Sequence, residues 1–271
     1  MRIEILYGEL ANLLGEHGTQ SLLAQTFGED KLIRTHFPEL PQFLVEDVDF
    51  VYMGPMTEQT QRLVLDLWRD KKDLFAKAIT RDTVFFFAGN ALDLVGRSIR
   101  YEERETVEAL GLYPFDTLCR RYDRQNEIVC ATFNEMPLTG FRSQFTTHTG
   151  DAGAFPFLVV EQGSGMNKDI QTEGIHDRNF FATSLLGPFL ILNPSFTKWL
   201  LARIGFHGTL PHEAALVDAE RIRLEDLALT FDRKRKLGAF YKAYKDKQEE
   251  ILSATPSTGA PNRKKNRKKL G

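Results

Sequence analysis

Cysteine is scarce in this chain of 271 residues, and long apolar runs are missing. The two cysteines, Cys119 and Cys130, are too few for a disulfide framework or a cysteine-rich metal site. No apolar stretch approaches the roughly 20 residues that a membrane-spanning helix needs. The opening MRIEILYGEL also lacks the basic start and apolar stretch of a secretory signal. These absences predict a cytoplasmic protein, and the composition is that of an ordinary globular chain.

Acidic and basic residues are unevenly distributed. The net charge is -2, but six basic residues lie together near the C-terminus: Arg263, Lys264, Lys265, Arg267, Lys268 and Lys269. The segment after residue 253 is poor in apolar residues, so we expect disorder there. A contact of this tail with RNA, anionic lipid or an acidic partner is the alternative. No aromatic residue is interleaved for base stacking, so such a contact would be weakly specific.

Apolar patterning predicts an α/β domain over residues 1–204, a helical extension over 205–253 and a basic tail over 254–271. The expected strands cover residues 3–7, 31–37, 48–53, 84–87 and 180–185, with further strands between 127 and 160. The expected helices cover residues 21–27, with Thr19 as N-cap, and 57–79, 194–204, 213–223 and 224–251. The strands after residue 127 are joined by turns, which indicates the antiparallel half of a mixed sheet.

The segment 83–96 has the pattern of a nucleophile elbow. An apolar strand that fits the middle of a parallel sheet ends in the small residues Ala88, Gly89 and Asn90, and a helix is expected from about Ala91. Hydrolytic α/β enzymes mount a nucleophile on such a turn, because the turn lifts the side chain above the sheet. Gly89 at the apex has no side chain to attack a substrate, but it adopts a positive φ at little cost.

The order of motifs resembles class I glutamine amidotransferases of the cobyric acid synthase type. The match is closest to the glutaminase subunits of lipid II isoglutaminyl synthases. Their opening LYPDLLNLYGDRGN corresponds to LYGELANLLGEHGT at 6–19, and their elbow CGGYQLLG corresponds to GNALDLVG at 89–96. Their NxxGTYLHGPLLxxNP corresponds to NFFATSLLGPFLILNP at 179–194. Weaker matches are GFRSQ from Gly140, GSGMN from Gly163 and the pair Glu173-Gly174.

The resemblance implies a three-layer, flavodoxin-like α/β fold with a mixed, mainly parallel sheet and a helical C-terminal extension. It also implies a chemistry that the residues do not supply. The family hydrolyses the side-chain amide of glutamine with a cysteine and a general-base histidine, and passes ammonia to a synthetase partner. In this chain the cysteine position is Gly89 and the histidine position is Leu186. The family's oxyanion loop becomes YMGPM, in which Gly54 survives but Pro55 has no backbone N–H to donate.

Four residues are candidates for a pocket near the elbow: Gly54, Asn90, Asp93 and Arg142. Asp93 stands where the family has glutamine, and it is either a new acid or an exposed helix residue. Gln144 replaces the histidine of the family's GFENH-like strand, and Arg124 is the nearest candidate for an expected arginine. We expect neither a cofactor nor a metal.

Other residues that might replace the lost pair are poorly placed. Cys119 and Cys130 do not lie at a strand-to-helix turn, so we expect buried structural roles. His207 is followed by glycine, as the general-base histidine of the family is. Assigning His207 as the base would, however, discard the Gly-Pro and Asn-Pro matches around Leu186. The remaining histidines lack metal-ligand spacing and are expected mostly in loops or at the surface: His17, His36, His148, His176 and His212. The glycines at 163 and 165 precede no convincing helix, which argues against a phosphate loop.

The sequence therefore predicts a catalytically inactive amidotransferase-like subunit or regulator that docks on an ATP-dependent, Mur-ligase-like synthetase. The pathway implied by the resemblance is amidation of a cell-wall precursor. Two alternatives stay open. One is an enzyme of altered chemistry at the old glutaminase pocket. The other is a binding module that acts through the basic tail.

Overall fold

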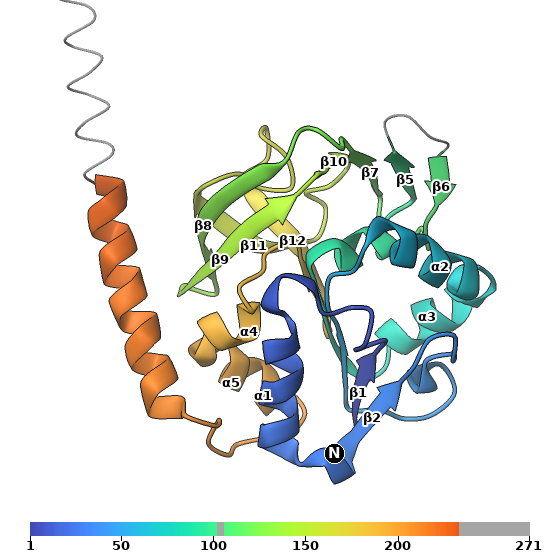
Figure 1. The fold of residues 1–271 in the computed structure, drawn as a ribbon, viewed down its shortest axis with the longest axis horizontal. Coiled ribbons are helices and arrows are strands. Elements are labelled where there is room, and N and C mark those ends of the chain that lie inside the picture. Colours follow the sequence, from blue (N-terminus) through green and yellow to red (C-terminus); the bar gives the residue numbers. More distant parts are fainter. Residues whose placement is uncertain (102–105, 233–271) are drawn as a thin grey trace, which may run out of the picture. The chain divides into compact units, whose positions relative to one another are not determined.

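A nine-stranded mixed sheet organises the protein (Figure 1). The computed structural model describes residues 1–101 and 106–232. The sheet order is β2 (Leu32–Thr35), β1 (Ile3–Leu6), β3 (Phe50–Met53), β4 (Val84–Ala88), β13 (Phe180–Thr183), β12 (Thr172–Asp177), β11 (Pro156–Gln162), β8 (Gln125–Phe133) and β9 (Met136–Gln144). The chain divides into two compact units, Met1–Ile222 and Arg223–Gly271, and the strands of the described residues all lie in the first.

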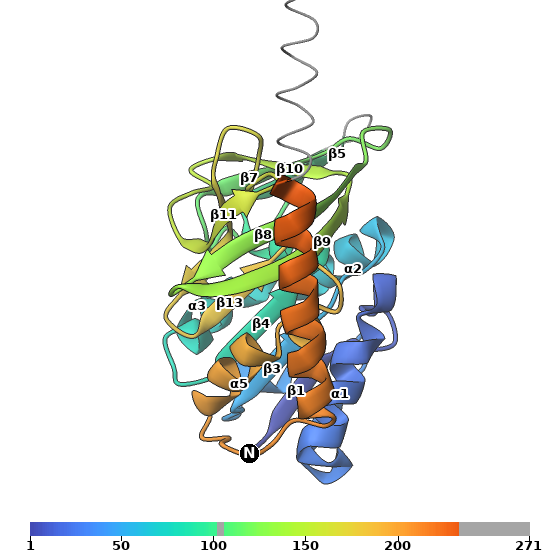
Figure 2. The same ribbon diagram turned by 90° about the vertical axis from the view of Figure 1, so that its left-hand side faces the viewer.

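The strand pairing of this sheet changes from parallel to antiparallel at β13. The strands from β2 to β13 pair in parallel, in the doubly wound order of flavodoxin-like folds. From β13 to β9 every pairing is antiparallel, and Figure 2 shows β8 and β9 side by side as a long hairpin. The predicted mixed sheet, with an antiparallel half after residue 127, is confirmed.

Helices cover both faces of the sheet, which confirms the predicted three layers (Figure 1). On one face lie α1 (His17–Phe27), α4 (Phe189–Leu192) and α5 (Pro194–Ala202), and on the other lie α2 (Glu58–Trp68) and α3 (Lys72–Ile79). Alternate residues of β4 point to opposite faces, so Phe86 packs in one apolar cluster while Phe85 and Phe87 pack in the other. The uninterrupted apolar run of β4 is therefore that of a strand buried on both faces.

A second, four-stranded sheet follows the elbow, and the sequence reading did not predict it. Its order is β10 (Thr146–Gly150), β7 (Phe115–Cys119), β5 (Ser98–Tyr101) and β6 (Thr106–Glu108). Strands β7 and β5 run parallel, and the outer strands pair antiparallel to them. This sheet brings Thr117 and His148 close to the elbow, as described below.

Several helix predictions were wrong in detail. Helix α1 begins at His17, so Thr19 lies inside the helix and does not cap it. Thr57 does cap α2, because its hydroxyl accepts a hydrogen bond from the N–H of Thr60 at 3.1 Å. The single helix expected over 57–79 is interrupted by the 3₁₀ turn η4 (Arg69–Lys71). No proline or glycine marks this break in the sequence.

The remaining differences concern the elbow and the C-terminal region. The segment after β4 is the 3₁₀ helix η5 (Gly89–Val95) instead of an α-helix. Residues 213–232 are helical without the break expected at 223. The rest of the second expected helix, over 233–251, and the basic tail over 254–271 lie outside the described residues. Within residues 1–101 and 106–232, no helix combines the length and the apolar character needed to cross a membrane.

Candidate functional site

The elbow and the segment after β13 meet at one end of the sheet. Strands β4 and β13 are parallel neighbours, and Ala88 pairs with Thr183 in their register. Gly89 and Leu186 follow these strands, so the chain leaves the sheet at the same edge in both places. Gly89 has a φ of +61°, a conformation that residues with a side chain rarely adopt. The structure therefore brings the two positions together, as the resemblance implies for the family's catalytic pair.

The space above Gly89 is filled. A Cβ atom placed on Gly89 would lie 2.6 Å from Cβ of Pro55 and 2.9 Å from Cδ2 of Leu186. Both distances are shorter than contacts between carbon atoms allow. The proline ring cannot swing aside as the end of a flexible side chain can. Any residue other than glycine at position 89 therefore requires the segment that carries Pro55 to move.

Asn90 fixes the segment that covers the elbow. Its side-chain oxygen accepts a hydrogen bond from the N–H of Met56 at 2.9 Å, and its amide nitrogen donates to the carbonyl of Met56 at 2.8 Å. The carbonyl of Pro55 accepts a further bond from the N–H of Leu13 at 3.1 Å. Asn90, one of the predicted pocket residues, thus holds Pro55 in contact with Gly89.

Leu186 is held from two sides. Its backbone N–H and carbonyl exchange two hydrogen bonds of 2.9 Å with Phe141 on β9. Next to it, Oε1 of the buried Glu16 accepts from the N–H groups of Gly187 and Phe189 at 3.3 and 3.2 Å. Oε2 of the same carboxylate accepts from the hydroxyls of Thr19 and Tyr52 at 2.8 and 2.9 Å. Burial raises the pKa of Glu16 above its ordinary value, although these four bonds oppose the shift.

A cavity of about 280 Å³ lies beside this filled position. Gly89, Asn90 and Leu186 line it, together with Pro55 and Ser184. Its remaining polar lining comes from hydroxyl and amide groups, with Arg124 and Glu58 as the charged residues and Cys119 as the thiol. Among the described lining residues there is no histidine. Gly54 does not line the cavity, and its missing side chain lets the carbonyl of Ala11 approach the backbone.

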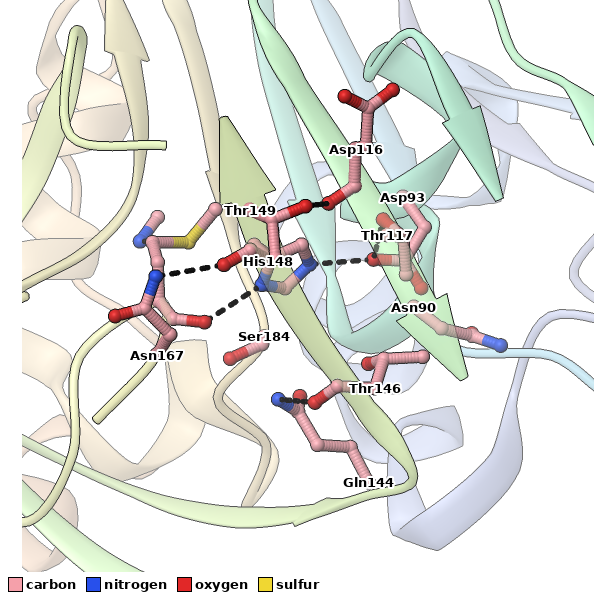
Figure 3. Close-up of polar contacts among 12 residues, drawn as sticks. Asn90, Asp93, Asp116, Thr117, Gln144, Thr146, His148, Thr149, Asn167 and Ser184 are labelled. Atoms are coloured by element: carbon pink, nitrogen blue, oxygen red, sulfur yellow. Dashed lines mark hydrogen bonds and ion pairs between the residues drawn. The ribbon is translucent and has the colours of Figure 1, made fainter. Parts of the chain in front are cut away.

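Asp93 and His148 form a buried pair behind the elbow (Figure 3). Nε2 of His148 lies 2.7 Å from Oδ1 of Asp93, and each side chain is 1% exposed. Nδ1 of His148 faces the carbonyl of Met166 at 3.2 Å, and the hydroxyl of Thr117 donates to Asp93 at 3.2 Å. The alternative in which Asp93 is an exposed helix residue was therefore wrong, and so was the placing of His148 among loop or surface histidines. His148 lies on β10, and both of its ring nitrogens already face partners.

Arg142 does not reach the cavity. Its guanidinium is fully buried and donates to the carbonyl of Gly165, between Glu127 at 3.6 Å and Glu173 at 3.9 Å. Glu173 also accepts from the hydroxyls of Thr183 and Ser184 at 2.5 and 2.6 Å. Arg142 therefore stabilises the loop around Gly165, and its neighbour Ser143 on β9 lines the cavity. No group of three or more acidic, histidine or cysteine side chains in residues 1–101 and 106–232 is arranged to hold a metal ion.

Sequence reasoning missed Glu16 and Ser184 as parts of this site. Glu16 lies in the stretch 6–19 that carries the family resemblance, and this match was the available signal. Ser184 lies two residues before Leu186 inside another matched motif. Cys119 and Cys130 lie in strands β7 and β8 and not at a strand-to-helix turn. Cys119 is buried and lines the cavity, whereas Cys130 is only half-buried, so its expected buried role was wrong.

Solved structures that share this fold include a glutamine amidotransferase. A glutamine amidotransferase crystal structure matches 76% of this chain and 100% of its own, with a TM-score of 0.52 and 12% identity. The structure of PurLQS from Thermotoga maritima matches 75% of this chain and 96% of its own, with a TM-score of 0.51 and 11% identity. No protein-family model matches the chain. The fold is that of the glutamine amidotransferases.

Two curated proteins give the nearer relationship by sequence. The lipid II isoglutaminyl synthase (glutamine-hydrolyzing) subunit GatD of Staphylococcus aureus (strain N315) is 23% identical over 175 residues, which cover 65% of this chain and 71% of that protein. The subunit of the same name from Streptococcus pneumoniae (strain ATCC BAA-255 / R6) is 24% identical over 208 residues, which cover 74% and 79%. The chain is a distant homologue of the GatD subunits.

Replacement of Gly89 by alanine is expected to destabilise the protein more than the same change at Gly15. Both glycines have a positive φ, which costs an alanine about 1–2 kcal/mol. Only Gly89 lies under Pro55, whereas a Cβ on Gly15 meets nothing within 4 Å. We expect Gly89→Ala to lower the free energy of unfolding by about 1–3 kcal/mol more than Gly15→Ala, because overpacking adds that amount. Denaturant unfolding measures both, and equal losses would refute the contact with Pro55.

Replacement of Glu16 by glutamine is expected to flatten the pH dependence of stability. Because the folded-state pKa is raised above 4.5, the folded chain holds this proton longer than the unfolded chain does. The contribution to stability is therefore full below the unfolded pKa and is lost as the pH rises through the folded pKa. Above about pH 4.5, the free energy of unfolding of Glu16→Gln should fall less with pH than that of the native protein. Glu161→Gln, at an exposed carboxylate, controls for the loss of one charge; identical slopes in all three proteins would contradict the prediction.

Proposed function

We propose that this protein is a non-catalytic, glutaminase-like subunit that docks on an ATP-dependent, Mur-ligase-like synthetase in the amidation of a cell-wall precursor. The observation that carries the proposal is the contact of Gly89 with Pro55 and Leu186. Thioester chemistry needs a thiolate at the elbow and a base beside it. Here the first position has no room for a side chain, and the second carries an alkyl group.

The retained framework supports a role in binding. The segments that carry Gly89 and Leu186 are held by specific contacts. Asn90 is bonded to Met56, and Glu16 is bonded to Gly187 and Phe189. The two curated relatives are named as subunits of a glutamine-hydrolysing synthase. A homologue that keeps such a frame without the nucleophile fits a partner-binding subunit. A cytoplasmic location, expected from the sequence, agrees with an ATP-dependent partner.

The other candidate side chains are already bound to groups of this chain. This supports the proposed function over a new chemistry at the glutaminase pocket. Asn90 is bound to Met56, Asp93 is buried against His148, and Arg142 is bonded to the carbonyl of Gly165. A general acid or base has to reach the proton that it transfers. Asp93 and Arg142 do not line the cavity, so neither is placed to do so.

The absence of glutaminase activity is tested with purified protein and glutamine, alone and with the synthetase. We expect no glutamate above the level given by Gly89→Ala, with a GatD subunit as positive control. The double variant Gly89→Cys, Leu186→His should also stay inactive, because Pro55 still occupies the space above residue 89. Glutamine turnover by the unmodified chain would overturn the proposal.

The subunit role is tested by co-expression with a Mur-ligase-like protein from the same organism. A complex that elutes together in size-exclusion chromatography is expected, and it should amidate its acceptor with ammonium chloride but not with glutamine. Recovery of this chain only as a separate monomer would count against a subunit role.

A further inference from the structure

Two segments on the rim of the cavity expose apolar and basic side chains. One segment is Leu13 and Leu14, which precede α1, and the other is the turn over residues 120–124 between β7 and β8. Both belong to the same rim, because Leu13, Leu14 and Arg124 all line the cavity. We call residues 13–14 and 120–124 together the rim surface.

The leucines of the rim surface are exposed at some energetic cost. Leu13 is 38% exposed and Leu14 is 51% exposed. Leu14 also has a φ of +57°, which is strained for a residue with a Cβ atom. Burial of the side chain does not offset this backbone strain, because Leu14 stays half exposed. Backbone strain of this kind is concentrated at places that bind ligands or partners.

The turn over residues 120–124 presents the residue types that dominate protein interfaces. Tyr122 is 83% exposed. The guanidinium of Arg124 is fixed in place, since it donates to the hydroxyl of Ser143 at 3.1 and 2.8 Å and lies 5.1 Å from the ring centre of Phe145. No carboxylate in residues 1–101 and 106–232 forms an ion pair with Arg121 or Arg124, whereas Arg120 pairs with Asp123 at 3.6 Å.

We propose that the rim surface binds an acidic segment of the synthetase partner, with an apolar side chain of that segment against Leu13 and Leu14. The proposal rests on the proposed function. The guanidinium groups of Arg121 and Arg124 have no carboxylate partner among the described residues, so they complement carboxylates of a partner, and a fixed guanidinium loses little freedom when it binds. The adjoining leucines supply apolar area that a purely polar ligand would leave exposed.

An acidic protein segment fits this surface better than a nucleic acid does. Single-stranded nucleic acids stack on a series of aromatic side chains along a basic groove, and the turn offers one exposed tyrosine. Without the six basic residues of the tail, the chain has 29 basic and 37 acidic residues. A net negative body repels a long polyanion, while a short acidic segment meets mainly the local arginines.

The test measures the affinity of the purified synthetase for the full chain by biolayer interferometry at two salt concentrations. Arg121→Glu with Arg124→Glu is expected to weaken binding at least about 10-fold and to lower its salt dependence. Lys77→Glu with Arg81→Glu, at exposed positions at the end of α3, is the matched charge reversal and should leave the affinity unchanged.

The variant Leu14→Gly separates a binding role from a structural one. Glycine relieves the positive φ, so the melting temperature of the free chain should rise while the affinity for the synthetase falls several-fold. A purely structural leucine would not move these two quantities in opposite directions. Leu40→Gly, at another exposed leucine, should leave the affinity unchanged.

Three outcomes would overturn the proposal. If the unmodified chain binds the synthetase and the Arg121, Arg124 and Leu14 variants bind equally well, the rim surface is wrong while the subunit role stands. If the unmodified chain does not bind the synthetase at all, the proposed function fails together with the rim surface. If a single-stranded RNA binds tightly and is lost on the same arginine reversal, the turn belongs to nucleic acid instead.

Discussion

The parallel pairing of β4 with β13 is the constraint on which the candidate site depends. It aligns Ala88 with Thr183, so the chain leaves both strands at the same end of the sheet. The elbow and the Leu186 segment must then share one small volume above the sheet. In an amidotransferase this arrangement places a nucleophile beside a base. Here the same geometry places Gly89 under Pro55 and Leu186, and the contacts of Asn90 and Glu16 hold the covering segments.

The part of the site that the sequence predicted is the part set by local motifs. Gly89 and Leu186 lie within runs anchored by glycine, asparagine and proline, and the structure places these two positions next to each other. The pair formed by Asp93 and His148 was not predicted, because it joins residues 55 positions apart and depends on the second sheet. The strands of that sheet are short, and the reading assigned no element between residues 97 and 126. Likewise, α2 breaks after Trp68 without a proline or glycine to indicate it.

The second sheet determines the environment of Asp93 behind the elbow. By supplying Thr117 and His148 to Asp93, it converts a position that looked solvent-exposed into a buried polar contact. Such a contact is stable only when its donors and acceptors are matched. The elbow is thereby fixed from behind by this network and from above by Pro55. A rigid elbow next to the exposed rim surface suits a protein that presents this surface to a partner.

The position of Pro55 also has an evolutionary consequence. A single substitution that placed cysteine at position 89 would meet Cβ of Pro55 at 2.6 Å, with Leu186 instead of a histidine beside it. Such a substitution alone would therefore lower stability without placing a base next to the thiol. Epistasis of this kind makes three residues depend on one another, since positions 55, 89 and 186 have to change together. Selection acting on one codon at a time would therefore keep glycine at position 89.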